Sequence, residues 1–273
     1  MKRTNVFAIC GVLLASAPMA FGHEFWIEPL EFQVQKDAPI EANLKNGELF
    51  AGSRQSFFED RNTFFQAIMG PRTTQITGRM GDRPAIQLPA PQEEGLMVLA
   101  HEAAPSTITY REWAKFVKFV DHKDFKHALS IHQARGWPQQ KFTETYTRHS
   151  KSLVAVGHGE GADRALGLET EFIALDNPYG AAFDGVMDLS LLYQGAPRVD
   201  AQVEIYARGP DDLVSVSIQR TDAYGKMSLS VQGGYDYMFD AVVLRPAPDA
   251  DIVEGAPIWE TLWATLTFSV PTP

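Results

Sequence analysis

The residues of this 273-residue chain with the clearest capacity for chemistry are its seven histidines. One of them, His23, directly follows a stretch with the features of a cleavable export signal: a basic start, a short apolar run and small residues near position 22. Cleavage after Gly22 would make His23 the first residue of the mature protein. A terminal histidine offers its α-amine and its imidazole Nδ1 to one metal ion, and these nitrogens suit Cu, Ni, Co or Zn.

Three other residues are candidate ligands beside His23. His101 ends a predicted buried strand, His122 follows a predicted amphipathic helix, and Glu24 directly follows His23. Two of them have a simpler interpretation: His101 as a strand-end histidine bonded to backbone, and Glu24 as an ordinary surface charge. The sequence therefore predicts a metal site anchored by His23, with His101, His122 and Glu24 as its possible further members.

The remaining histidines are weaker candidates. His122, His127 and His132 are five residues apart, which on one helix turns successive side chains too far round to serve one ion. For His127 and His132 a solvated surface is the default expectation. His149 adjoins basic residues, which disfavours a cation, and His158 lies in a glycine-rich segment where exposure is expected.

The net charge and the cysteine content limit which partners and which metal ligands are expected. Of 24 basic and 34 acidic residues, two basic ones lie in the signal, so the mature charge is 22 − 34, or −12. This charge disfavours nucleic acid and anionic lipid as partners and favours cations. The only cysteine, Cys10, also lies in the signal, which leaves histidine, carboxylate or backbone groups as ligands. No second apolar run is long enough to span a membrane.

In the first half of the mature chain, apolar residues recur at strand spacing in some segments and at helical spacing in others. Asn46-Gly47 predicts a hairpin between short strands at 38–44 and 48–50. Thr109 and Glu112 match a capping box, and apolar residues then follow at helical spacing, so a helical segment is expected within 109–135. The glycine-rich stretch 157–163 is the best linker candidate, and its glycines lack phosphate-loop spacing.

From about residue 166 onwards apolar residues mostly recur at every second position, as in antiparallel strands. The fold class predicted is mainly β, with two immunoglobulin-like β-sandwich domains and a short helical insertion in the first. The expected division is a signal peptide at 1–22, an N-terminal β-rich domain at 23–160 with the helical segment 109–135, and a C-terminal β-sandwich at 166–273.

Several segments spread over the mature chain carry a resemblance to a known family: His23–Pro29, Tyr146–Val154, Gly167–Glu169 continuing to Asn177–Tyr179, Leu192–Pro197, Thr221–Gly225 and Trp263–Phe268. Together they resemble the DUF4198 family, which is grouped with periplasmic components associated with cobalt and nickel uptake. The resemblance implies an exported, β-rich, non-enzymatic metal-handling protein. Of the candidate ligands it carries over only His23.

Enzyme signatures are mostly absent: His101-Glu102 lacks the second histidine of a zinc protease, and no Gly-x-Ser-x-Gly elbow occurs. The main expectation is a periplasmic protein that binds cobalt, nickel or copper for uptake or homeostasis, with an inner-membrane metal transporter as a possible partner. Two alternatives stay open. One is a copper oxygenase in which His23 and another histidine activate oxygen on a polysaccharide, and the other is a metal-free β-sandwich binding module.

Overall fold

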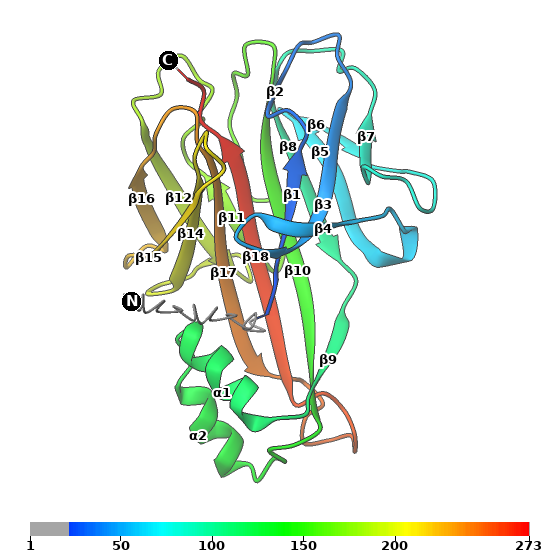
Figure 1. Cartoon of the computed structure of the whole chain (residues 1–273), viewed down its shortest axis with the longest axis vertical. Helices are drawn as coiled ribbons and strands as arrows, with labels where there is room; N and C mark the ends of the chain where they lie inside the picture. Colours follow the sequence, from blue (N-terminus) through cyan, green and yellow to red (C-terminus); the bar gives the residue numbers. More distant parts are fainter. Residues whose placement is uncertain (1–21, 273) are drawn as a thin grey trace, which may run out of the picture.

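Strands dominate the computed structural model, which describes residues 22–272 (Figure 1). The prediction of a mainly β fold is confirmed, and the described residues contain two α-helices, both within the expected segment 109–135. No helix in this part of the chain is long and apolar enough to cross a membrane. The predicted signal peptide lies outside the described residues, except for Gly22.

A ten-stranded sheet forms the centre of the molecule. Its path is β15 (Val214–Arg220), β14 (Gln202–Arg208), β17 (Asp236–Pro246), β18 (Trp259–Ser269), β10 (Phe142–Val156), β8 (Gly95–Ala103), β5 (Asn62–Met69) and β6 (Arg72–Gln75). Two further strands, β2 (Gln33–Val34) and β9 (Ser106–Tyr110), pair with the ends of β10.

Two smaller sheets cover the central one. One contains β1 (Glu24–Pro29), β3 (Ile40–Glu48), β4 (Ala51–Gln55) and β7 (Ile86–Leu88). The other contains β11 (Thr170–Ala174), β12 (Val186–Tyr193), β13 (Ala196–Pro197) and β16 (Lys226–Ser230).

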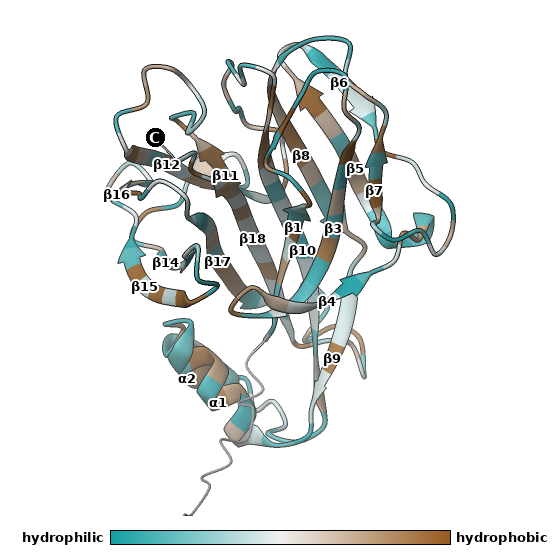
Figure 2. Cartoon of the chain, turned by 45° about the horizontal axis from the view of Figure 1, so that its top comes forward, coloured by the Kyte–Doolittle hydropathy of each residue, from teal (hydrophilic) through white to brown (hydrophobic). Residues whose placement is uncertain are grey.

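The alternation of side chains along β8 explains why two cores form on its two faces. Met97 and Leu99 belong to the core that includes Ile27 of β1, whereas Leu96 and Val98 belong to the core that includes Phe172 of β11. Successive side chains of a strand point to opposite faces, so a strand covered on both sides is apolar throughout. Figure 2 shows this hydrophobic character along β8, β18 and β11.

The central sheet passes through the boundary expected near 157–166. β10 pairs antiparallel with β8 from the N-terminal half and parallel with β18, which is near the C-terminus. The core around Phe172 likewise includes Ile68 and Leu153 from the N-terminal half. The two-domain division stays a prediction, and the strand pairing shows that its two parts share one sheet.

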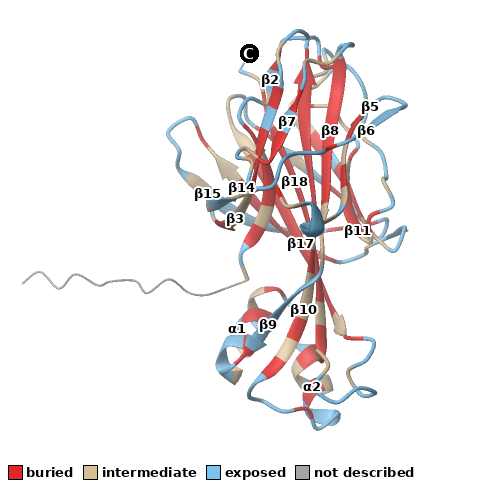
Figure 3. Cartoon of the chain, turned by 90° about the vertical axis from the view of Figure 1, so that its right-hand side faces the viewer, coloured by how far each residue is buried: buried red, intermediate tan, exposed pale blue. Residues whose placement is uncertain are grey.

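The helices α1 (Trp113–His122) and α2 (His127–Ala134) pack at one end of the central sheet (Figures 1 and 3). Phe116 and Val120 are buried, as their helical spacing predicts. The predicted capping box is wrong: Thr109 pairs with Thr143 in a β-ladder, and Glu112 is the N-cap without a side-chain cap bond. Sheet pairing therefore takes precedence over the local capping signal. A single 3₁₀ turn, η1, spans Glu59–Arg61.

Candidate functional site

His23 lies on the wall of a cleft, immediately before β1. Its side chain is 53% exposed, and its Nε2 is 3.7 Å from Oε1 of Glu48, whose side chain is 37% exposed. The cleft has a volume of about 550 Å³, and Tyr146, Arg148 and Trp263 line it together with His23. The contact with Glu48 is the one polar contact of the His23 ring among residues 22–272.

The position of Glu48 depends on how β3 ends. The hairpin expected at Asn46-Gly47 is wrong: β3 continues to Glu48, and the turn falls on Leu49 and Phe50, both with positive φ. Gly47 pairs with Glu24 across β1 and β3, so Glu48 lies next to the start of β1. The longer strand thereby brings a carboxylate to the imidazole of His23.

Arg148 lines this cleft and also a second one of about 490 Å³, as Tyr146 does. Its guanidinium lies over the Trp263 ring, 4.1 Å from the centroid, and 5.2 Å from that of Tyr146. Its Nη1 is buried and has no hydrogen-bond partner in the described part of the chain. Burial lowers the pKa of Arg148, while Asp240 and other carboxylates oppose this effect.

Three carboxylates from three strands meet in the interior: Glu24 of β1, Glu204 of β14 and Asp240 of β17. We call them, together with Lys123, His122 and Tyr206, the buried acid cluster. The Nζ of Lys123 lies 3.0 Å from Glu204 and 2.8 Å from Asp240. All three carboxylates are almost fully buried, so their charges depend on these partners rather than on water.

Glu24 is joined to Glu204 through one phenol. The Tyr206 hydroxyl donates to Oε2 of Glu204 at 2.6 Å and lies 3.1 Å from Oε1 of Glu24. Burial, followed by the charge of Asp240, raises the pKa of Glu24 to about 7. Because the hydroxyl has a single proton, a protonated Glu24 would donate to the Tyr206 oxygen and complete the chain of hydrogen bonds.

His122 enters the same cluster from the end of α1. Its Nε2 lies 3.1 Å from Oε1 of Glu204. Burial opposes ionisation of Glu204, but the hydrogen bond from His122 and the charge of Lys123 lower its pKa to about 2. The structure thus brings two predicted site residues, Glu24 and His122, into one network through Glu204 and Tyr206.

His101 lies elsewhere, against the second cleft. It is 1% exposed on β8, its ring stacks on Phe25, and Phe65 meets it edge-on. Its Nε2 is 2.8 Å from Oδ1 of Asn62. Burial lowers the pKa of His101 to about 3, so the ring is neutral. Within residues 22–272 no group of three or more His, Cys, Asp or Glu side chains is arranged to hold a metal ion.

The exposure of the other histidines agrees only in part with the prediction from the sequence. His158 is 57% exposed, as predicted, and pairs with Glu94 at 3.7 Å. His132, expected on the surface, is fully buried and accepts a hydrogen bond at Nδ1 from Trp259 Nε1 at 3.1 Å. His149 is also buried, with Nδ1 3.0 Å from the Trp263 carbonyl. The local sequence gives no signal for these long-range packing contacts.

A family model described as "Domain of unknown function (DUF4198)" matches residues 20–245. The chain belongs to the DUF4198 family. The match includes His23 and most of the segments that carry the resemblance, whereas the closing segment Trp263–Phe268 lies beyond it.

Comparisons with proteins outside the DUF4198 family give only distant similarities. No curated protein matches the chain. The D0–D1 domain of intimin is similar at 10% identity with a TM-score of 0.21, covering 89% of this chain and 97% of that one. A tetra-tandem repeat from the extending region of a large adhesion protein is similar at 10% identity with a TM-score of 0.20, covering 91% of this chain and 50% of that one.

Proposed function

We propose that this DUF4198 member is an exported periplasmic protein that binds a transition-metal ion, cobalt, nickel or copper, as cargo for uptake or homeostasis. The observation that carries the proposal is the place of His23. Its ring stands half exposed on a cleft wall with Glu48 on the Nε2 side, and Nδ1 has no polar partner among the described residues.

This arrangement suits a chelate by the terminal residue. Cleavage after Gly22 would convert the backbone nitrogen of His23 into an amine, which with Nδ1 supplies two donors to one ion. A carboxylate at the other ring nitrogen is a common partner of metal-binding histidines, because it fixes the tautomer and raises the basicity of the ligating nitrogen. At 3.7 Å, Glu48 requires only a small movement to accept a hydrogen bond from Nε2.

The remaining candidate ligands are held by other groups. His122 and Glu24 belong to the buried acid cluster, and His101 lies buried among aromatic rings. A site of two nitrogen donors completed by water or a small ligand is open, which suits a cargo ion that must be released to an inner-membrane transporter. The mature charge of −12 favours the approach of cations.

The deciding experiment is a nickel, cobalt and copper titration of the mature protein against three variants. One carries an extra residue before His23, one is His23→Ala, and the third is the control His158→Ala. His158 matches His23 closely, because it is half exposed and pairs with a glutamate at the same distance of 3.7 Å.

The extension and His23→Ala should both weaken binding, since an amide replaces the amine in the first and the imidazole is lost in the second. His158→Ala should bind like the wild type. Equal affinities for the wild type and the extended protein would rule out the terminus as the site. Intact-mass measurement of the exported protein checks that it begins at His23.

Two alternative functions predict different experimental results from this proposal. A histidine-brace copper oxygenase would consume oxygen in the presence of copper, a reductant and a polysaccharide, which a cargo-binding protein would not do. A metal-free binding module would show no saturable metal binding at all.

A further inference from the structure

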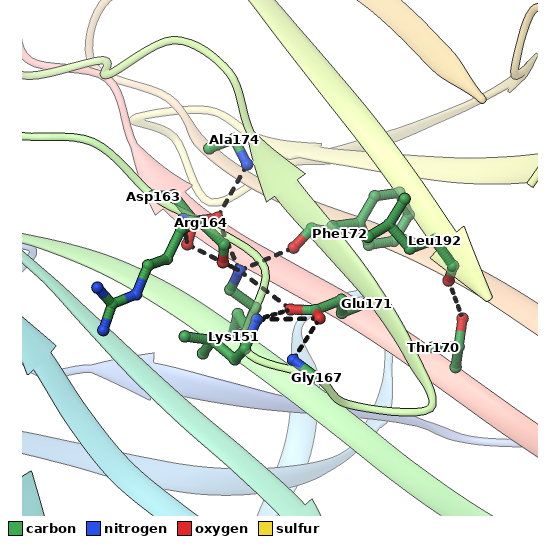
Figure 4. Close-up of polar contacts among 10 residues, drawn as sticks. Lys151, Asp163, Arg164, Gly167, Thr170, Glu171, Phe172, Ala174 and Leu192 are labelled. Carbon is green, nitrogen blue, oxygen red and sulfur yellow. Dashed lines mark hydrogen bonds and ion pairs between the residues drawn. The ribbon is translucent and has the colours of Figure 1, made fainter. Parts of the chain in front are cut away.

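A second buried cluster, separate from the metal site proposed above, contains one lysine and two carboxylates. Lys151 of β10, Asp163 of the following connection and Glu171 of β11 have side chains 1%, 0% and 2% exposed (Figure 4). The Nζ of Lys151 is 2.7 Å from Oδ1 and 2.8 Å from Oδ2 of Asp163, and 3.6 Å from Oε2 of Glu171.

We propose that this cluster is the site of an intramolecular isopeptide bond, formed by the chain itself between Nζ of Lys151 and Cγ of Asp163. With Nζ near both carboxylate oxygens, ordinary covalent geometry puts Cγ within the roughly 3–3.5 Å at which reacting atoms are poised to combine. Burial of all three side chains excludes bulk water, which would otherwise favour the free ions.

The hydrogen bonds of Lys151 orient it for this reaction. Nζ donates to the carbonyl oxygens of Phe172 at 2.9 Å and Arg164 at 3.0 Å. Two of its three protons are therefore held by backbone, and the third points towards Asp163. When that proton moves to the Asp163 carboxylate, the lone pair left on Nζ faces Cγ.

Asp163 is held as the electrophile. Its Oδ2 accepts a hydrogen bond from the backbone N–H of Ala174 at 2.9 Å, and Oδ1 accepts one from the N–H of Arg164 at 2.7 Å. Fixed backbone donors stabilise the negative charge that develops on a carbonyl oxygen during attack. The same groups that stabilise the ion pair thus also favour the tetrahedral intermediate.

Glu171 is placed as the general base. Its carboxylate accepts hydrogen bonds from the backbone N–H groups of Leu166 and Gly167, at 2.9–3.0 Å. These bonds hold the carboxylate in place with Oε2 3.6 Å from Nζ, where it can accept a proton from Nζ as the C–N bond forms. Glu171 then returns that proton to the departing oxygen of Asp163.

The reaction balances without a further reagent. The Lys151 ammonium and the Asp163 carboxylate become one amide and one water: the C–N bond forms, one C–O bond breaks, and no electrons leave the system. A neutral amide also replaces a buried ion pair, whose desolvation is costly. The product ties β10 to the connection that follows it, whose stretch 157–163 was expected to be a linker.

Tryptic mapping of the fully denatured protein tests the proposal. An isopeptide blocks cleavage after Lys151, so residues 149–164 should appear as one peptide that is lighter by about 18 Da, the mass of the water lost when the covalent bond forms. Lys45 is the internal control, because it forms an ion pair of the same length with Glu28, 2.7 Å, and should be cleaved normally. Complete cleavage after Lys151, with residues 152–164 at their unmodified mass, would overturn the proposal.

The role of Glu171 is tested by Glu171→Gln, with Glu169→Gln as the control. Glu169 precedes the same strand but pairs with Arg245. Glu171→Gln should yield the unmodified peptide 152–164, and Glu169→Gln should retain the lighter one. A lighter peptide of unchanged yield in Glu171→Gln would overturn the assignment of Glu171 as the base, and Lys151→Arg shows the fully unlinked chain for comparison.

Discussion

Glu204 and Asp240 lie directly opposite each other on β14 and β17, and both carboxylates contact the same ammonium, that of Lys123. Two buried negative charges on facing residues would repel each other strongly without this cation. Lys123 is 5% exposed, so no water replaces its partners. It comes from the end of α1, and the helix pair is therefore fixed to the central sheet by charge as well as by aromatic packing.

Replacing this lysine should be costly. We expect Lys123→Met to lower the free energy of unfolding by about 3–5 kcal/mol, because it leaves buried carboxylates without their cation. Chemical denaturation at neutral pH measures the change. The control is Lys115→Met on the same helix, where an exposed pair with Glu112 at 3.3 Å should contribute less than about 1 kcal/mol. A similar small loss in both variants would contradict the idea that Lys123 neutralises the cluster.

The raised pKa of Glu24 predicts that the free energy of unfolding falls as the pH rises. Its pKa is about 7 in the folded chain against an ordinary value of 4.5, so the folded state holds the proton more tightly. Protonated Glu24 therefore makes its full contribution to the free energy of unfolding below pH 4.5, and this contribution is lost as the pH rises to about 7 and beyond. Glu24→Gln has no proton to lose, and its amide can donate to Tyr206.

We therefore expect Glu24→Gln to be more stable than the wild type at pH 8, by roughly 2 kcal/mol, and to show a smaller decline between pH 4.5 and 7. Denaturant unfolding at a series of pH values measures both. Parallel curves for the two proteins would show that Glu24 does not titrate in this range.

Much of the secondary structure follows from local pattern. The alternation after residue 166 predicts strands, and the spacing of Phe116 and Val120 predicts the amphipathic helix. The parallel pairing of β10 with β18 has no such signal, because it joins segments more than 100 residues apart, as Glu144 and Trp259 show. Sheet partners are chosen by packing across the whole chain.

The buried charges were the least predictable feature. Lys151 follows the polar run at 143–150, which suggests an exposed strand, and Asp163 ends a glycine-rich stretch that suggests a free linker. Both are buried because β11 and this connection close over β10. Similarly, Glu24 adjoins the predicted ligand His23, but the alternation of β1 turns its side chain inwards.

If Glu48 orients the His23 imidazole, its removal should weaken metal binding without abolishing it. We expect Glu48→Gln to reduce affinity about 10–100-fold, the usual effect of losing a carboxylate that positions a ligand. Calorimetric titration measures this loss. Glu41→Gln, at an exposed position of the same strand, is the control and should bind normally. Unchanged affinity in Glu48→Gln would mean that Glu48 has no part in the site.

His101 should be important for folding but not for metal binding. Its ring fills the space between Phe25 and Phe65, so His101→Ala should leave a cavity and lower the free energy of unfolding by about 2–4 kcal/mol. Since it lines the second cleft rather than the one that contains His23, the affinity for nickel, cobalt or copper should stay within a few-fold of the wild type. Both quantities are measured on the same preparation, by denaturation and by titration.

The depressed pKa of His101 provides an independent check. A folded pKa of about 3, below the ordinary 6.5, means that the unfolded chain binds the proton more readily. The contribution of the neutral ring to stability is therefore full above pH 6.5 and declines as the pH falls towards 3. This acid-side decline should be smaller in His101→Ala. A large loss of metal affinity at neutral pH, with little loss of stability, would instead place His101 in the metal site.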